Sequence, residues 1–587
     1  MEMKKKLSMF LMGILVILLF AGCSGQTESE KFDAFIQQVF VDTMESDYTT
    51  AHVFMEEPKT FGVDESKITV NLGERIDETA MESSRKSTKE SLDGLKAFDR
   101  AKLTEEQQDT YDILMYMVTV SDGLNDEKFD YYQQLLESMT GIHYQLPALL
   151  ADWELRDEQD VKDLITLVND VKPYMSSLLE YTKEQEKRGL LMIDIDEVIS
   201  YCEKVCEKGE ESSILTSLNE GIDALSLGDE PSSTYKTQLR EAFTTSFLPA
   251  YEDIISTLNT FKSGTNNEEG YAKFPNGKDY YELLLQRSIG STKSVEEIRQ
   301  MMSEAFTSHI MNLQEIMASN PEILETLQNE LPTSGYDSYE SILDAVSSVM
   351  FDDFPNVDNL NYVIKDVNEE ISSDSGVAAY FNVPPLDGTG SQQMRVNPNL
   401  GDVDAITTYH TVAHEGYPGH MYQYAYAYAN LTSPFRKALA ESSAYTEGWA
   451  VYAQYTAYNY LTDIDQNLLA FLRENDLASY CAVILADIGI HYDGWTYDEF
   501  AERLSSLFGD DEEALLGQYK QLQANPCAFE PYYVGYEEIM AIRENATEKL
   551  GDSFNEKEFN EAVLKSGNAP FSVVEKNVDS YIASKSK

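Results

Sequence analysis

The sequence predicts a mostly α-helical protein with a small β-sheet in its second half. Apolar residues recur at helical spacing through much of the chain, and from about residue 78 to 262 the pattern is almost continuous. Helical segments resume at residue 278 and run to the end, interrupted most clearly over residues 376–398, which contain a Pro-Pro pair and several glycines. At 587 residues the chain is long enough to bury a large core.

The first residues have the form of a bacterial export signal. Three lysines precede an apolar run over residues 7–20, and small residues then lead to Cys23. The run is short for a membrane span, which is the alternative, and a cysteine directly after Ala-Gly resembles a lipobox. Phe20 departs from the usual leucine. We expect residues 1–22 to be a lipoprotein signal peptide and lipid on Cys23 to anchor the chain to the outer face of the bacterial cell membrane.

Two regions are expected after this signal. Residues 24–31 are polar, so we expect a flexible tether over 23–32 and an N-terminal helical region over 33–263. Its apolar stripes, such as Val161, Leu164, Ile165 and Val168, predict buried helix faces rather than a cofactor site. Turn-forming residues over 263–278 separate it from a second region, 264–587.

Helices and one hairpin are predicted in the second region. Ser294 and Glu297 have the spacing of a capping box at a helix start. Residues 377–381 and 394–396 predict short strands around a turn, and their edge either pairs with an extended peptide or is purely structural. The predicted helices cover 278–288, 294–318, 321–329, 338–351, 402–416, 436–461, 466–490, 497–508, 512–523, 531–549, 556–566 and 571–583.

The charge balance limits the classes of partner. The chain has 102 acidic residues against 44 Lys and Arg, a net charge of −58. Such a surface repels a phosphate backbone, so we expect no nucleic acid partner. Four cysteines besides Cys23 are too few for a disulfide framework in an exported chain of this length.

Residues 414–420, His-Glu-Gly-Tyr-Pro-Gly-His, carry the chemistry. Two imidazoles and a carboxylate are what a zinc hydrolase needs, namely two metal ligands and a base that activates water. In the common H-E-x-x-H motif the histidines are four residues apart on one helix face, whereas His414 and His420 are six apart. A regular helix would turn His420 away, so Pro418 and Gly419 are expected to break the helix and return His420 to the metal.

This stretch resembles the H-E-x-x-P-G-H signature of the DUF885 family of predicted zinc peptidases. Further segments that resemble the family are 275–281, 447–450 (E-G-W-A), 487–491 with Gly-Trp at 494–495, and 532–535. The match covers the C-terminal half well and the N-terminal half diffusely. Met421 stands where the family often has a second histidine, and Gln454 where it often has glutamate.

The resemblance implies Glu447 as the third metal ligand beside His414 and His420. Two histidines and one glutamate are the ligand set of gluzincin-like metallopeptidases, and zinc is the expected cofactor. Glu415 directly follows a ligand, so it is expected beside the metal as the general base. Glu441 is an alternative ligand. His410 is another, four residues before His414, although Glu415 and His420 would then have no role.

His491 and Tyr532 are the candidates for stabilising an oxyanion. Zinc peptidases generally need such a donor besides the metal. Tyr533 competes with Tyr532, and His491 has an alternative role as a core histidine bonded to backbone. Asp487 is a candidate for orienting a ligand histidine.

Together these features predict a zinc-dependent peptidase that hydrolyses peptide bonds. We expect a large multi-helical, gluzincin-like fold in which residues 264–587 bind the metal and the active site lies in a cleft against the N-terminal helices. Arg287 or Arg543 could clamp a substrate carboxylate, although the sequence places neither in the cleft. The alternative is a non-catalytic surface lipoprotein that binds peptide or metal, which would not need a base at Glu415.

Overall fold

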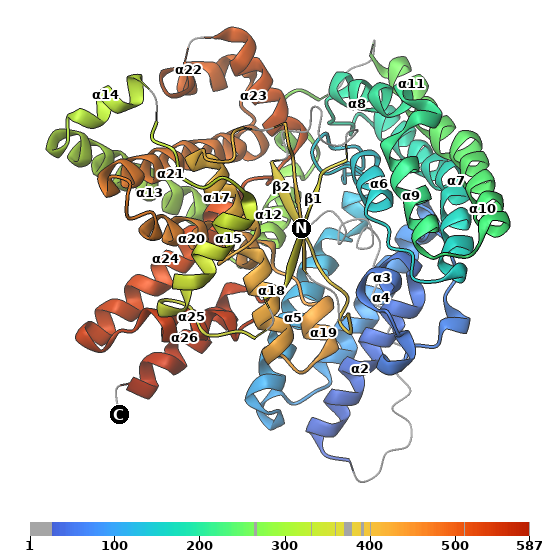
Figure 1. Cartoon of the computed structure of the whole chain (residues 1–587), viewed down its shortest axis with the longest axis horizontal. Coiled ribbons are helices and arrows are strands. Elements are labelled where there is room, and N and C mark those ends of the chain that lie inside the picture. The colour runs from blue at the N-terminus through green and yellow to red at the C-terminus, as the bar shows by residue number, and fades with distance from the viewer. Residues whose placement is uncertain are drawn as a thin grey trace.

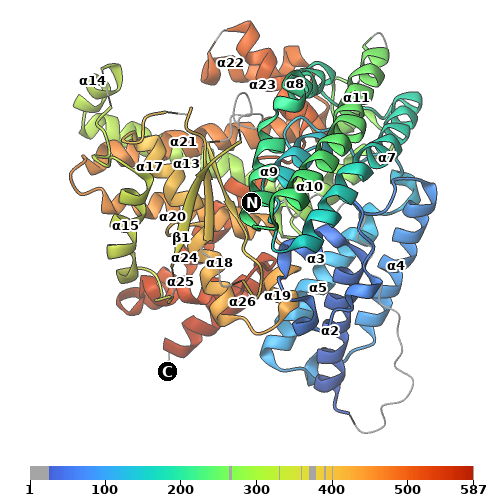
Figure 2. The same ribbon diagram turned by 45° about the vertical axis from the view of Figure 1, so that its right-hand side comes forward.

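The structure, a computed structural model, confirms a mostly α-helical fold with a small sheet. It describes residues 26–262, 267–329, 331–358, 360–368, 378–388, 392–399, 401–509 and 511–585, so the predicted signal peptide and Cys23 lie outside it. Helices of the N-terminal half (blue to green) and of the C-terminal half (orange to red) lie side by side, with the sheet between them (Figures 1 and 2). Over these ranges, no helix combines the length and the apolar character that crossing a membrane requires.

Amphipathic helices build the N-terminal half. Val161, Leu164 and Val168 of the predicted stripe are fully buried in the core, and Ile165 packs against it. The helices here are α2 (Glu28–Ser46), α3 (Tyr48–Phe54), α4 (Glu78–Lys96), α5 (Glu105–Leu124), α6 (Ile142–Ala151), α7 (Glu158–Arg188), α8 (Ile195–Glu207), α9 (Ser213–Ala224), α10 (Asp229–Ala242) and α11 (Leu248–Phe261).

The second half follows the predicted helices closely. Its helices are α12 (Gly277–Ile289), α13 (Val295–Ser319), α14 (Glu322–Gln328), α15 (Tyr339–Val349), α17 (Ile406–Glu415), α18 (His420–Asn430), α19 (Pro434–Ala438), α20 (Ser443–Ala457), α21 (Gln466–Ile488), α22 (Tyr497–Phe508), α23 (Glu512–Ala524), α24 (Glu530–Leu550), α25 (Glu556–Leu564) and α26 (Phe571–Lys585). The capping box is confirmed, since the Ser294 hydroxyl accepts from the Glu297 N–H and the Glu297 carboxylate accepts from the Ser294 N–H.

One predicted helix is wrong in its extent. The segment 436–461 is two helices, because the N–H groups of Leu439 and Ala440 both turn back to the carbonyl of Phe435 and close α19. Helix α20 then begins at Ser443.

Three strands form the sheet, in the order β1-β3-β2. Strands β2 (Ala379–Asn382) and β3 (Gln392–Val396) are antiparallel, as the predicted hairpin requires. Strand β1 (Tyr362–Asp366), which the sequence analysis missed, runs parallel to β3, with Tyr362 opposite Gln392. Strand β2 is therefore an edge, and it lies beside α17.

Candidate metal centre and active-site cavity

A cavity of about 820 Å³ lies between the two halves of the chain. Its walls include Tyr116 of α5, Glu137 of the segment before α6, Arg287 of α12, His414 of α17 and Tyr532 of α24. The predicted cleft between the N-terminal helices and the second half is thus confirmed.

The chain breaks between the two motif histidines, as the sequence predicts. His414 lies in the last turn of α17 and His420 is the first residue of α18. Between them, the Gly419 N–H bonds the Ala413 carbonyl (3.0 Å) and the Tyr417–Pro418 peptide bond is cis. A Cβ atom on Gly419 would lie 1.9 Å from the His414 carbonyl oxygen, so only glycine fits this turn.

His414, which lines the cavity, comes together with His420 and Glu447, which are buried. Glu447 Oε2 lies 3.4 Å from His414 Nε2 and 3.2 Å from His420 Nε2. The ligand atoms of all three residues lie within 4.8 Å of one another. In a tetrahedral zinc site, neighbouring N and O ligands lie about 3.3 Å apart. These three donors therefore have the chemistry and the spacing that fit Zn²⁺. Glu441 lines the cavity but is not in this group.

The charges of the group suit a metal. Burial would raise the pKa of Glu447, but the charges and hydrogen bonds of His420 and His414 hold the pKa of this carboxyl well below its usual range. Burial likewise disfavours the charged form of His414, and its contacts with Glu447 and Glu415 nevertheless raise its pKa. Glu447 is therefore an anion, the form in which a carboxylate binds metal.

Gln454 orients His414. The His414 Nδ1 atom lies 2.7 Å from Gln454 Oε1, which only accepts, so Nδ1 carries a proton and Nε2 is the nitrogen left to bind a metal. The sequence analysis noted Gln454 only as a departure from the family. Gln454 follows Glu447 by seven residues, or two turns of α20, so both lie on one helix face. This spacing could have identified Gln454 as a residue of the site.

Glu415 is held by the edge of the sheet. Its Oε2 atom accepts a hydrogen bond of 2.9 Å from the Phe381 N–H of β2, and its Oε1 atom lies 3.8 Å from His414 Nε2. One oxygen is therefore fixed by backbone while the other faces the group of ligands. The hairpin thus has a contact with the site that the sequence analysis did not foresee.

Of the two adjacent tyrosines, Tyr532 lies beside the ligands. Its ring stacks on that of His414, with centroids 6.1 Å apart and planes at 19°. The Tyr533 ring stacks instead on Tyr480, with centroids 3.7 Å apart. His410 also lines the cavity, and its Nδ1 atom lies 3.2 Å from the Tyr458 hydroxyl. Burial lowers the pKa of His410 to about 4, so it is neutral near pH 7.

The structure does not bring His491 to the cavity lining. This residue is fully buried; its Nε2 atom lies 3.0 Å from the Leu522 carbonyl oxygen, and its Nδ1 atom accepts from the Tyr271 N–H (3.3 Å). Both ring nitrogens are bonded to backbone, which corrects the expected contact with an oxyanion. Asp487 accepts from the Tyr281 hydroxyl (2.6 Å) rather than orienting a ligand histidine.

A close helix crossing positions Glu447. Helix α20 crosses α24 at Gly448 and Gly535, where a Cβ atom on Gly448 would lie 2.4 Å from the Gly535 carbonyl carbon. Because neither residue has a side chain, the backbones touch. This crossing places Glu447, next to Gly448, beside the two histidines, and Tyr532, on the first turn of α24, in the cavity lining.

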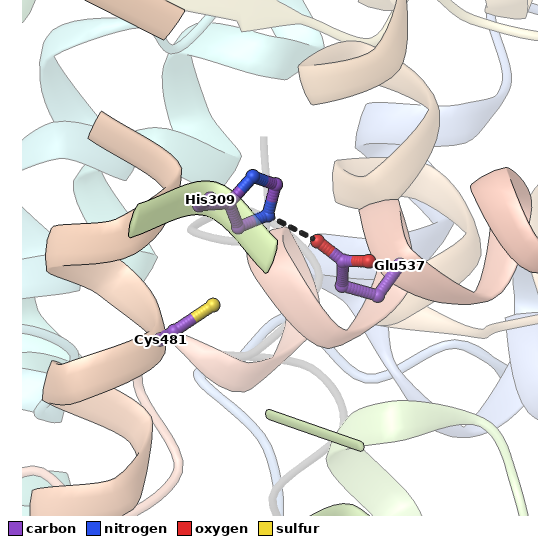
Figure 3. Close-up of side chains that lie close together, drawn as sticks. All are labelled: His309, Cys481 and Glu537. Carbon is purple, nitrogen blue, oxygen red and sulfur yellow. Dashed lines mark hydrogen bonds and ion pairs between the residues drawn. The ribbon is translucent and has the colours of Figure 1, made fainter. Parts of the chain in front are cut away.

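A second group of ligand-type side chains is separate from this site and joins three helices. His309 of α13, Cys481 of α21 and Glu537 of α24 have ligand atoms within 4.8 Å of one another (Figure 3). His309 bonds Glu537 through Nε2 (3.0 Å) and Glu474 through Nδ1 (2.7 Å). With a carboxylate at each nitrogen, His309 is a cation between two anions, and we assign the group a structural role.

This histidine predicts a pH-dependent stability. Burial opposes its charge, but hydrogen bonds to Glu474 and Glu537 raise the pKa of His309 from 6.5 to about 9. The folded state holds the proton more tightly than the unfolded state, so the stabilisation is complete below pH 6.5 and is lost as pH rises through about 9. We expect the free energy of unfolding to fall by on the order of 1–3 kcal/mol across this window, measured by denaturant unfolding.

The variant His309→Gln is the control for this prediction. It should remove that part of the pH dependence, whereas equal slopes in both proteins would contradict the assignment. Two other groups that face the cluster should not add to this pH dependence. Arg473 also pairs with Glu474. Burial raises the pKa of the Cys481 thiol, so the thiol does not lose its proton in this window.

Comparison with known proteins agrees with this fold. The model of the family described as "Bacterial protein of unknown function (DUF885)" matches residues 61–578. The sequence matches no curated protein. A predicted lipoprotein from Colwellia psychrerythraea has a crystal structure with a TM-score of 0.81 and 20% identity, covering 95% of this chain and 100% of its own.

Two further structures are more distant. A predicted lipoprotein of unknown function from Shewanella oneidensis gives a TM-score of 0.57 at 16% identity, over 86% of this chain and 93% of its own. A predicted oligoendopeptidase F from Bacillus anthracis gives a TM-score of only 0.30 at 11% identity, over 87% of this chain and 97% of its own.

Proposed function

The chain belongs to the DUF885 family of bacterial proteins of unknown function, and from its site we propose that it is a zinc-dependent peptidase. The observation that supports this most is the group formed by His414, His420 and Glu447, of which His414 lines a large cavity, with the second oxygen of Glu415 beside it. A structural metal site needs no base at its edge and is usually closed by a fourth protein ligand.

Each residue has a role in this proposal. His414, His420 and Glu447 would hold Zn²⁺, which when bound supplies a Lewis acid and lowers the pKa of water. Glu415 Oε1, the oxygen that Phe381 leaves free, would take the proton of the attacking water and pass it to the leaving amine. The Tyr532 hydroxyl would donate to the carbonyl oxygen as its negative charge grows. His491 has no part in this reaction.

The proposal includes the protein's place in the cell. The N-terminal sequence has the form of a lipoprotein signal, and two structurally similar proteins carry lipoprotein descriptions. We propose that the chain is exported and held at the outer face of the cell membrane by lipid on Cys23, where peptides would be its substrates.

Metal removal tests this function. Protein purified without added metal should contain about one zinc per chain and should cleave members of a mixed peptide library. Chelation should abolish cleavage, and stoichiometric Zn²⁺ should restore it. Elemental analysis and mass spectrometry of the peptides give both readouts. Zinc without cleavage would favour the non-catalytic binding protein, and absence of any metal would overturn the ligand assignment.

A further inference from the structure

Positive charge is scarce in the cavity. Among the residues that the structure describes there, Arg287 is the one Lys or Arg side chain that lines the walls. The same walls carry four carboxylates, which belong to Glu137, Glu415, Glu441 and Asp476. Apart from the candidate metal centre, a negatively charged part of a ligand would therefore be favoured mainly beside Arg287.

Arg287 has no counter-ion among the residues that the structure describes. Within the described ranges its guanidinium forms no ion pair, although it belongs to a chain in which acidic residues outnumber basic ones by 102 to 44. Arg543, the other arginine that the sequence analysis considered, does not line the cavity, and its Nε atom pairs with Glu556 at 2.8 Å. Of these two arginines, Arg287 is therefore the one that lines the cavity and that pairs with no carboxylate among the described residues.

The backbone around Arg287 is fixed on both sides. The Tyr116 hydroxyl donates to the carbonyl groups of Gln286 and Ser291, and the Ser288 hydroxyl donates to the Cys527 carbonyl (3.1 Å). Cys527 is five residues before Tyr532, whose ring stacks on His414. Arg287 and the candidate metal centre are thus joined through one short segment and face the same cavity.

We propose that Arg287 binds the C-terminal carboxylate of the substrate, so that the protein removes residues from the C-terminus of short peptides. This inference rests on the proposed function and names its substrate class. A guanidinium can bind both oxygens of a carboxylate, which a single ammonium group cannot do with the same geometry. The cavity volume suits a short peptide, and its carboxylates favour the substrate's ammonium end.

The test compares one peptide as the free acid and as the C-terminal amide. Wild-type protein should favour the acid in kcat/KM by on the order of 10- to 100-fold, and Arg287→Gln should lose this preference through a higher KM for the acid. Arg287→Lys should retain part of it. Arg240→Gln, an exposed arginine on α10 outside the cavity lining, is the matched control and should behave as wild type.

The outcomes separate this inference from the proposed function. If wild-type protein cleaved the acid and the amide equally, carboxylate binding by Arg287 would be overturned, while the proposed peptidase activity would stand. If wild-type protein cleaved neither peptide, the proposed peptidase activity would be contradicted. A binding measurement would then test carboxylate binding by Arg287. Calorimetry on Glu415→Gln should show tighter binding of the acid than of the amide, with the difference lost when Arg287→Gln is added. Equal binding of the acid and the amide would overturn the role of Arg287.

Discussion

Glu415→Gln is expected to lower kcat by about 10³-fold while the metal stays bound. Glutamine has the same shape, and its side-chain oxygen can still accept the Phe381 N–H that holds this side chain. It cannot take a proton from water, because an amide is not a base at neutral pH. Peptide turnover and zinc content, measured on the same preparation, test this result.

A second glutamate variant separates the base from the ligand. Glu447→Gln should lose metal as well as activity, since Glu447 Oε2 is the atom that both histidines approach. Glu441→Gln should keep its metal, because Glu441 lies outside the group of ligand atoms. Loss of zinc from Glu415→Gln would instead make Glu415 a ligand and would contradict its assignment as the base.

The parts of the site that depend on local geometry were predictable from the sequence. The break between α17 and α18 follows from Pro418 and Gly419, whose backbone preferences act within one turn. Most helices were also predicted, because their apolar spacing is read within a short window.

The parts that depend on packing were not predictable in the same way. Strand β1 pairs in parallel with β3, whose residues lie thirty positions later in the sequence. Most of the chain around these strands is helical. The Phe381 N–H reaches Glu415 only because β2 is an edge strand beside α17. The sequence does not show the contacts of a side chain, so a histidine within a motif resembles a catalytic one. Only the contacts of His491 with Leu522 and Tyr271 show that it supports the backbone.

The glycine pair behind Glu447 leads to the second large effect. Gly448→Ala is expected to destabilise the fold by about 3 kcal/mol and to reduce metal binding. The new Cβ atom would lie 2.4 Å from the Gly535 carbonyl carbon, which is helix backbone and cannot rotate away. Helices α20 and α24 would have to separate, and Glu447, the preceding residue, would move from the histidines. Chemical unfolding and zinc content measure the two effects.

Gly517→Ala is the matched control, because Gly517 is an exposed glycine inside α23 and a Cβ atom added there would have no neighbouring atom within 4 Å. There alanine should stabilise the helix by about 0.5–1 kcal/mol, the ordinary propensity difference. Opposite signs at the two positions would therefore show that backbone contact, rather than helix propensity, decides the outcome at Gly448. If Gly448→Ala were as stable as Gly517→Ala and retained its zinc, the crossing would not be what positions Glu447.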